Sequence, residues 1–261
     1  MKKLFVAAIL LMAIVSCKPY QVALPGDLGN TSEKLHVKGT SISVFGHKIK
    51  VDGFGEGHMY SGFTFSSSTE HRLFPLYFDK DSRMNYISNH FSKQLDRSKT
   101  KFNFEFASNG VYANTYCVAH TKQTSLAMKP SDINIGLSES YSFDGIIFTN
   151  KAKEPWRISF SGSKNIKDGF KDIFGNVRHT NGLLTNDSVQ ININQVFSTN
   201  KKHEHGFIKI PVGFEFTDGD KILAFIDAFE NNIFISSEVN EYTRMILLSA
   251  ATSVLVKYTA S

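Results

Sequence analysis

Cysteine is scarce in this chain, which has 261 residues but only two cysteines, Cys17 and Cys117. One pair is too few for the disulfide frameworks that stabilise many small secreted domains. The fold must therefore depend on a hydrophobic core. The composition fits this, because 41% hydrophobic and 20% charged residues are values typical of globular proteins.

Long apolar runs are also missing. A membrane-spanning helix needs about 20 consecutive apolar residues. The stretches 4–15 and 245–256, which are apolar or small throughout, contain only twelve residues each. The sequence therefore predicts no spanning helix.

Charge of one sign does not accumulate along the chain. The formal net charge is +5, and without residues 1–16 it becomes +3, because 27 basic residues then face 24 acidic ones. No run of Lys and Arg is interleaved with aromatic residues in the manner of a nucleic-acid-binding segment. We expect a solvated surface and no nucleic-acid partner.

The N-terminus has the order of residues that is typical of a secretory signal. Lys2 and Lys3 precede the apolar residues 4–15, and Ser16 and Cys17 follow. This junction resembles the signal of bacterial lipoproteins. The resemblance implies that Cys17 is lipidated and that its acyl chains hold the protein on a membrane of the bacterial cell envelope.

The same resemblance divides the chain into three parts. Residues 1–16 are the lipoprotein signal peptide. Residues 17–36 are rich in Pro, Gly and Asn without a sustained period and are predicted to be a flexible tether. Residues 37–261 are predicted to be a β-rich globular domain. Lys18, where an Asp often marks inner-membrane lipoproteins, favours the outer membrane, with the domain facing the periplasm or the exterior.

Short alternating segments separated by turn residues predict a mainly β fold. Three phenylalanines alternate with other residues in the segment 102–106, and Asn109-Gly110 follows as a strong hairpin signal. Asp218-Gly219 and Asp144-Gly145 predict two further hairpin turns. Other predicted strands are residues 41–45, 48–51, 60–65, 156–160, 189–193, 206–210 and 232–235. The pattern indicates an antiparallel β-barrel or sandwich.

Two helices are predicted besides the strands. A helix from Asp81 or Ser82 to about Arg97 would be amphipathic, because its apolar residues share one face at helical spacing. Residues 245–256 are apolar or small all the way round, so a helix there must be buried on every side. The simplest arrangement is a hydrophobic C-terminal helix enclosed by sheet.

The C-terminal part resembles the tubby C-terminal and LURP-one type of fold, in which a β-barrel closes around a hydrophobic helix. The similar residues are the hairpin 214–224, the strand 233–235, Glu241 and the apolar helix 245–256. The resemblance implies a barrel with its helix inside. It lies in the pattern of hydropathy and assigns no functional residue.

Candidate catalytic and metal-binding residues are few. Cys117 lies in an alternating segment and is predicted to be a small buried strand residue. His203 and His205 share one face of an extended segment, as a Zn²⁺ or Cu²⁺ site can require, but no third ligand with diagnostic spacing follows. Residues 53–57 and 79–81 match dinucleotide-binding and Ca²⁺-binding loops only in part. We predict no catalytic residue and no cofactor.

Two classes of function are compatible with these observations. The first is a lipid-anchored cell-envelope protein with a non-catalytic binding or structural role. The alternative is a secreted hydrolase, or a protein that holds lipids or other apolar ligands inside a Phe-rich barrel. A large apolar pocket with convergent polar groups would favour the alternative. A helix that fills the barrel would argue against it.

Overall fold

The computed structural model describes residues 24–26, 28–40, 47–61, 65–72, 91–128, 133–165, 179–197 and 211–259. Its strands are β1 (Ser32–Lys38), β2 (His47–Val51), β3 (Gly55–Ser61), β4 (Phe65–Arg72), β5 (Phe91–Ser108), β6 (Val111–Met128), β7 (Ile133–Thr149), β8 (Trp156–Asn165), β9 (His179–Thr185), β10 (Gln190–Phe197), β11 (Pro211–Asp218), β12 (Lys221–Asp227) and β13 (Asn232–Ser236). The helices within these ranges are α2 (Leu28–Thr31) and α4 (Glu241–Thr259).

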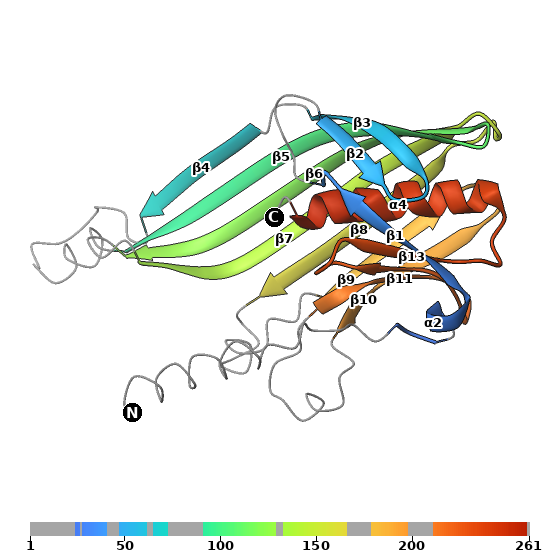
Figure 1. Cartoon of the computed structure of the whole chain (residues 1–261). Coiled ribbons are helices and arrows are strands. Elements are labelled where there is room, and N and C mark those ends of the chain that lie inside the picture. The colour runs from blue at the N-terminus through green and yellow to red at the C-terminus, as the bar shows by residue number, and fades with distance from the viewer. Residues whose placement is uncertain are drawn as a thin grey trace, which may run out of the picture.

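Twelve of the strands form a closed antiparallel barrel (Figure 1). From β5 to β13 each strand pairs with the next, β13 pairs with β1, and β1 continues through β2 to β3. The pairing of β3 with β5 closes the ring. Strand β4 lies outside the ring and pairs with the part of β5 that extends beyond β3. The predicted mainly β barrel is confirmed.

Turn residues define two of the hairpins. Asn109 and Gly110 join β5 to β6 with φ angles of 50° and 73°, and two positive angles are the pattern of a type I′ turn. The turn between β11 and β12 is confirmed in place, but its two loop residues are Gly219 and Asp220. Only Gly219 has a positive φ, of 57°. One positive angle at the first loop position is the pattern of a type II′ turn.

The third predicted hairpin turn, at Asp144-Gly145, is wrong, because both residues lie inside β7. Gly145 pairs with Cys117 of β6 and with Ile158 of β8. A Cβ atom at position 145 would lie 2.7 Å from Ile158 Cγ2 and 3.1 Å from Cys117 Sγ. The glycine therefore permits close packing inside the barrel, and the chain turns only after Thr149.

The predicted amphipathic helix is wrong over residues 91–97, which belong to β5; residues 73–90 lie outside the described residues. Within this segment Leu95 pairs with Thr69 of β4 on one side and with Thr124 of β6 on the other. Pairing on both edges satisfies the backbone as a strand. It overrides the helical spacing of a few apolar side chains.

The described secondary structure begins before residue 36, the expected end of the tether. Leu28 of α2 is buried, and Leu35 and Val37 of β1 belong to the core. Among the other predicted strands, residues 48–51, 156–160, 190–193 and 232–235 lie in strands, whereas 41–45 and 206–210 fall outside the described ranges. Of residues 60–65, only 60–61 and 65 are described, and these lie in β3 and β4.

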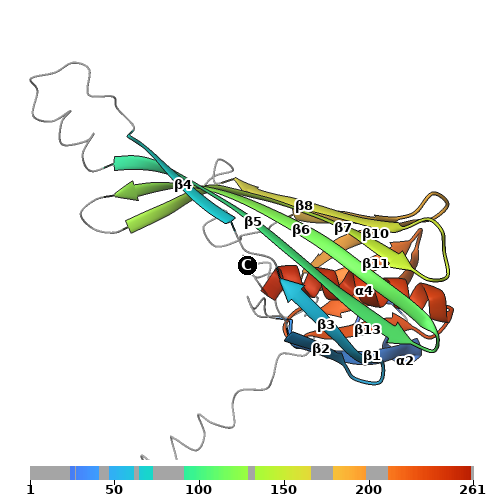
Figure 2. The ribbon, with the colours of Figure 1, turned by 90° about the horizontal axis from the view of Figure 1, so that it is seen from above.

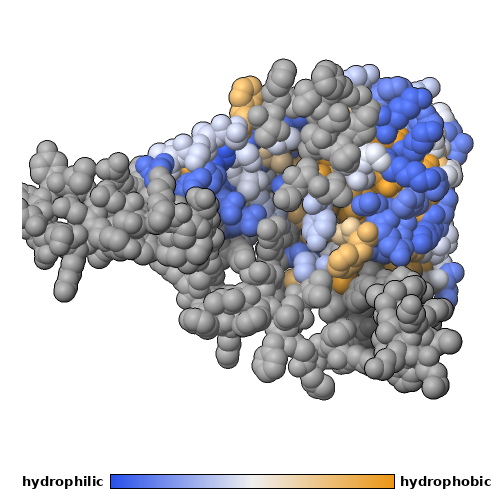
Figure 3. Space-filling model, turned by 60° about the vertical axis from the view of Figure 1, so that its left-hand side comes forward, coloured by the Kyte–Doolittle hydropathy of each residue, from blue (hydrophilic) through white to orange (hydrophobic). Residues whose placement is uncertain are grey.

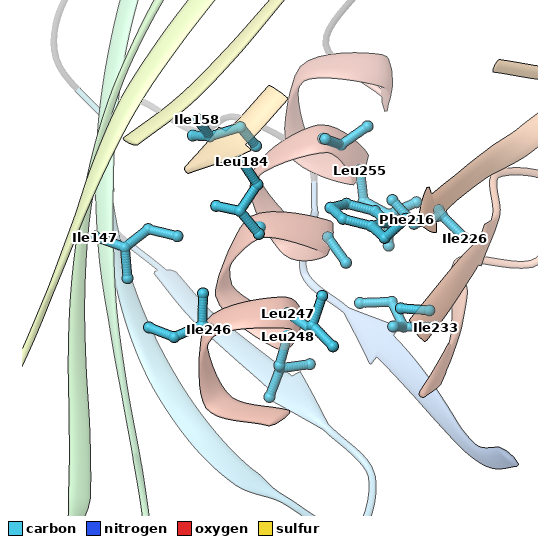
Figure 4. Packing of buried hydrophobic residues seen from close by; sticks show 14 of the residues in the cluster. Ile147, Ile158, Leu184, Phe216, Ile226, Ile233, Ile246, Leu247, Leu248 and Leu255 are labelled. Carbon is cyan, nitrogen blue, oxygen red and sulfur yellow. The ribbon is translucent and has the colours of Figure 1, made fainter. Parts of the chain in front are cut away.

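Helix α4 lies inside the barrel, as predicted for residues 245–256. Each of these twelve residues is at most 1% exposed. Ile147, Ile158 and Leu184 approach the helix from one side, and Phe216, Ile226 and Ile233 approach it from the other side (Figure 4). The helix has no polar stripe because no side of it faces water.

The first turn of α4 is attached to the surrounding strands by polar contacts. Asn240 caps the helix, since its Oδ1 accepts a hydrogen bond from the backbone N–H of Thr243 at 2.9 Å. The Trp156 ring N–H donates to the Tyr242 hydroxyl at 2.8 Å. The Arg244 guanidinium pairs with Glu33 of β1. These contacts fix where the helix begins relative to the barrel.

Strands β5, β6 and β7 are much longer than the barrel requires, with 18, 18 and 17 residues. The pairing of β7 with β8 starts only at Ser138. Beyond it, the three strands and β4 continue as a projecting sheet, here called the arm (Figure 2). Most of its described side chains are polar, as Lys93, Gln94 and Thr124 illustrate, whereas Leu95 and Phe65 are apolar.

We predict that Leu248→Asp strongly destabilises the fold and lowers its thermal transition. Leu248 is 0% exposed in the middle of α4, and an unpaired buried carboxylate costs roughly 3–5 kcal/mol of a total stability of about 5–15 kcal/mol. Thermal unfolding followed by circular dichroism measures the effect. Leu248→Met, which conserves volume, is the control and should lower stability by less than about 1.5 kcal/mol. A cooperative transition of Leu248→Asp at the wild-type temperature would place the helix elsewhere.

Candidate anion-binding groove on the barrel wall

Strand alternation sets a row of cations on the outer wall of the barrel. Phe102 and Phe104 of β5 point into the core and are buried. Successive side chains of a strand point to opposite faces. Arg97, Lys99 and Lys101 therefore point outward, and Arg97 and Lys101 are exposed while Lys99 is half-buried.

Strand β6 adds a histidine and a lysine beside this row. His120 pairs with Lys99, and Lys122 pairs with Arg97; both β6 side chains are exposed. We call the five residues Arg97, Lys99, Lys101, His120 and Lys122 the wall cluster. Basic side chains directly opposite one another on neighbouring strands destabilise a sheet when both are charged. The structure therefore places basic side chains next to one another here, although their mutual repulsion destabilises the sheet.

No acid in the described parts of the chain lies within ion-pairing distance of any wall-cluster residue. Asp144 lies on the same outer face, but in the strand register it stands opposite Val118 and not opposite a basic residue. Asp96 is on β5 too, but alternation places it on the opposite face of the sheet. The cations are therefore available to an external anion.

Several lysines elsewhere on the barrel have acidic partners. Lys50 and Lys48 both bind Glu56, and their hydrogen bonds lower the pKa of that carboxyl to about 2. Lys221 pairs with Glu238 at 2.7 Å. Hydrophilic residues dominate much of the described barrel surface in Figure 3, with hydrophobic ones scattered among them. Lys151, Lys153 and Arg157 also lack an acidic partner among the described residues. The wall cluster differs from them in that its basic side chains lie opposite one another on neighbouring strands.

Four residues of the wall cluster line a shallow open groove of about 520 Å³. Arg97, Lys99 and Lys122 supply its charge, and His120 lies among them. The remainder is rich in hydroxyl groups, and its lining includes Ser66, Ser67, Ser98, Ser140 and Ser142. Cations beside hydroxyl donors form a surface that can bind anionic oxygens.

The predicted site residues do not meet at this groove. Cys117 is a buried strand residue, as predicted, 2% exposed on the inner face of β6. Its thiol donates a weak hydrogen bond to Ser253 Oγ at 3.5 Å. Burial raises its pKa to about 12, so it has neither the access nor the ionisation of a nucleophile.

The other sequence candidates are placed as follows. Cys17, His203, His205 and residues 79–81 lie outside the described residues. Residues 53–57 form the turn from β2 into β3, with Gly53 at a φ of 76°. A strand follows this turn, so the segment lacks the helix N-terminus that a dinucleotide loop needs.

The described residues contain no metal site and no membrane-spanning helix. No group of three or more His, Cys, Asp or Glu residues in these ranges could hold a metal ion. No helix in them has both the length and the hydropathy to cross a bilayer.

No known family model, curated protein or solved structure matches this chain. Strand register brings the residues of the wall cluster together. The sequence contains a signal for the cluster, because Arg97, Lys99 and Lys101 are spaced by two, as are His120 and Lys122. This spacing indicates a shared face only once residues 91–101 are known to form a strand.

We predict that the Cys117 thiol is unreactive in the native protein. A pKa of about 12 leaves roughly one thiol in ten thousand ionised at pH 8, and burial blocks access. The Cys17→Ser variant, whose only cysteine is Cys117, should react with Ellman's reagent only after denaturation. Rapid reaction of one thiol without denaturant would contradict the described core.

Proposed function

We propose that this chain is a lipid-anchored cell-envelope protein that holds an anionic partner on the outer wall of a filled barrel and performs no catalysis. One observation carries the proposal. Four of the five wall-cluster residues line one open groove, and none of the five has an acidic partner among the described residues. Charge complementarity of this kind favours association with a negatively charged ligand.

The filled interior supports a role on the outer surface. Helix α4 occupies the barrel, and no residue in 245–256 is more than 1% exposed. The same enclosure of a hydrophobic helix supports the resemblance to the tubby C-terminal type of fold. That resemblance concerns architecture, and the proposed anion-binding role rests on the residues of this chain.

The N-terminal sequence supports attachment to a membrane. The Ser16-Cys17 junction is typical of a lipoprotein signal. Ten residues separate Cys17 from Leu28, the first residue of α2, and a fully extended chain of this length reaches roughly 35 Å. The barrel would therefore remain close to the membrane surface, where it can hold a partner of the cell envelope.

The alternative function, binding an apolar ligand, has weaker support. A pocket at the mouth of the barrel, beside Val254, Lys257 and Tyr258 of α4, has a volume of about 190 Å³. Pockets for drug-sized ligands span about 300–1,000 Å³. The mouth pocket is too small for an acyl chain of ordinary length.

We predict that Cys17 carries the lipid. Metabolic labelling with a clickable fatty acid should mark the wild-type protein and leave Cys17→Ala unlabelled, because the thioether forms only on this sulfur. Cys117→Ala is the matched control and should keep the label. Labelling of Cys17→Ala would disprove lipidation at this residue.

We predict that the wall cluster binds polyanions. The triple variant Arg97→Gln, Lys99→Gln, Lys122→Gln should bind dextran sulfate about tenfold more weakly than the wild type, at a few tenths to 1 kcal/mol for each exposed pair. Isothermal titration calorimetry at two salt concentrations measures the affinity, which should fall as salt rises.

The control for this experiment has the same net charge. The triple variant Lys34→Gln, Lys38→Gln, Lys221→Gln removes three lysines that pair with Glu230, Asp52 and Glu238. It should bind dextran sulfate nearly as well as the wild type. Equal losses in the two triple variants would show a general charge effect and would reject the wall cluster as a site.

A further inference from the structure

A second groove lies on the same wall, next to the wall cluster. It has a volume of about 670 Å³, and its lining includes Lys101, Tyr116, Asp144 and Ile146. A third, of about 390 Å³, shares Ser142 with the first groove and shares Asp144 and Ser159 with the second. The three grooves are therefore neighbours along one outer surface that spans several strands.

Apolar side chains are exposed beside the second groove. Tyr60, Tyr116, Ile146 and Phe148 are 54%, 53%, 39% and 47% exposed; we call them the apolar patch. Tyr116 and Phe148 meet edge to face with their ring centroids 6.1 Å apart. A group of rings left in water on one face of a sheet is typical of a binding surface.

Strand register places the patch in a continuous row. Tyr60 pairs with Asn103, Asn103 with Tyr116, Tyr116 with Ile146, and Ile146 with Arg157. Neighbouring strands lie about 4.8 Å apart, so this row extends over roughly 19 Å. That length accommodates several sugar residues of an extended chain.

The groups around the patch differ in charge from the wall cluster. Asn103 and Asn114 present amides, and Glu105 and Asp144 present carboxylates, on the same outer face as Tyr116. Amides and carboxylates accept hydrogen bonds from hydroxyl groups. Lys101 and Arg157 line the same groove, so basic and acidic side chains lie together beside the rings.

From this arrangement we infer that the three grooves bind a linear acidic polysaccharide, and the inference rests on the anion-binding role proposed above. The wall cluster would pair with its carboxylate or sulfate groups. The rings of Tyr60 and Tyr116 would stack on the apolar faces of its sugar rings. Serine and asparagine side chains along the grooves would bind its hydroxyl groups.

Other polyanions fit these observations less well. A single-stranded nucleic acid uses cations and rings together, but single-stranded DNA has no free hydroxyl groups along its chain for the serine and asparagine side chains of the grooves to bind. An acyl chain needs an enclosed apolar cavity, and these grooves are open. A polysaccharide combines rings, many hydroxyl groups and spaced negative charges, and each has a counterpart on this wall.

The test compares polygalacturonate with its fully methyl-esterified form, which has the same sugar rings without charge. The full chain, purified in detergent, should bind polygalacturonate and should bind the ester at least about tenfold more weakly, since the ester has no partner for the wall cluster. Tyr116→Ala should weaken binding of polygalacturonate roughly fivefold, the effect of losing one stacked ring.

The control for Tyr116→Ala is Phe229→Ala. Phe229 is 55% exposed but lies at the turn between β12 and β13, outside the grooves. This variant should bind polygalacturonate as the wild type does. Thermal unfolding should show that both variants keep the wild-type fold.

The outcomes separate this inference from the proposed function. Loss of dextran sulfate binding in both triple variants alike would reject the proposed function itself. If dextran sulfate binds through the wall cluster but Tyr116→Ala leaves polygalacturonate affinity unchanged, the site binds anions and the polysaccharide inference is wrong. Tighter binding of oligo(dT) or of vesicles containing phosphatidylglycerol than of polygalacturonate would overturn it as well.

Discussion

Enclosure of α4 by twelve strands is the constraint on which the rest of this structure depends. A helix that is apolar or small on every side has no stable position on a surface exposed to water. A barrel of about eight strands is filled by its own side chains, and its diameter grows with the number of strands. A twelve-stranded barrel therefore needs additional material inside, and α4 provides it. Each part buries the apolar surface of the other.

Filling the interior leaves the outer face of the strands for function. Along β5, β6 and β7 most buried inward positions carry apolar or small residues and pack against α4 or its neighbours, as Phe104, Cys117 and Ile147 do. Alternation frees every second residue for the solvent. On these strands the free positions hold the wall cluster and all of the apolar patch except Tyr60 of β3, so the core and the proposed binding surface occupy opposite faces of the same strands.

The sequence predicts those parts of the fold in which a local pattern has one physical meaning. A period of two with Asn109-Gly110 predicts the β5–β6 hairpin, and the unbroken apolar stretch 245–256 predicts a buried helix. Asp144-Gly145 has two meanings, because a glycine serves a turn and a close contact equally well. Residues 91–97 lie partly in the arm, where neither face is a core and the apolar period of a strand is absent.

The candidate site was less predictable than the fold. Strand register, which pairs Lys99 with His120 and Arg97 with Lys122, is a long-range property that local patterns do not contain. The predicted burial of Cys117 is confirmed, because alternation in its own segment sufficed. Lipidation of Cys17 stays a prediction, and the weak metal candidates His203 and His205 stay untested, since all three residues lie outside the described ranges.

Native-state hydrogen exchange of α4 tests the central claim most directly. If the helix is enclosed, the amides of residues 245–256 can exchange only when the barrel opens, and their exchange free energy should equal the global free energy of unfolding. The strands that surround the helix should give the same value. Exchange of these helix amides at nearly zero free energy, while β11, β12 and β13 remain protected, would show that α4 is not held inside the barrel.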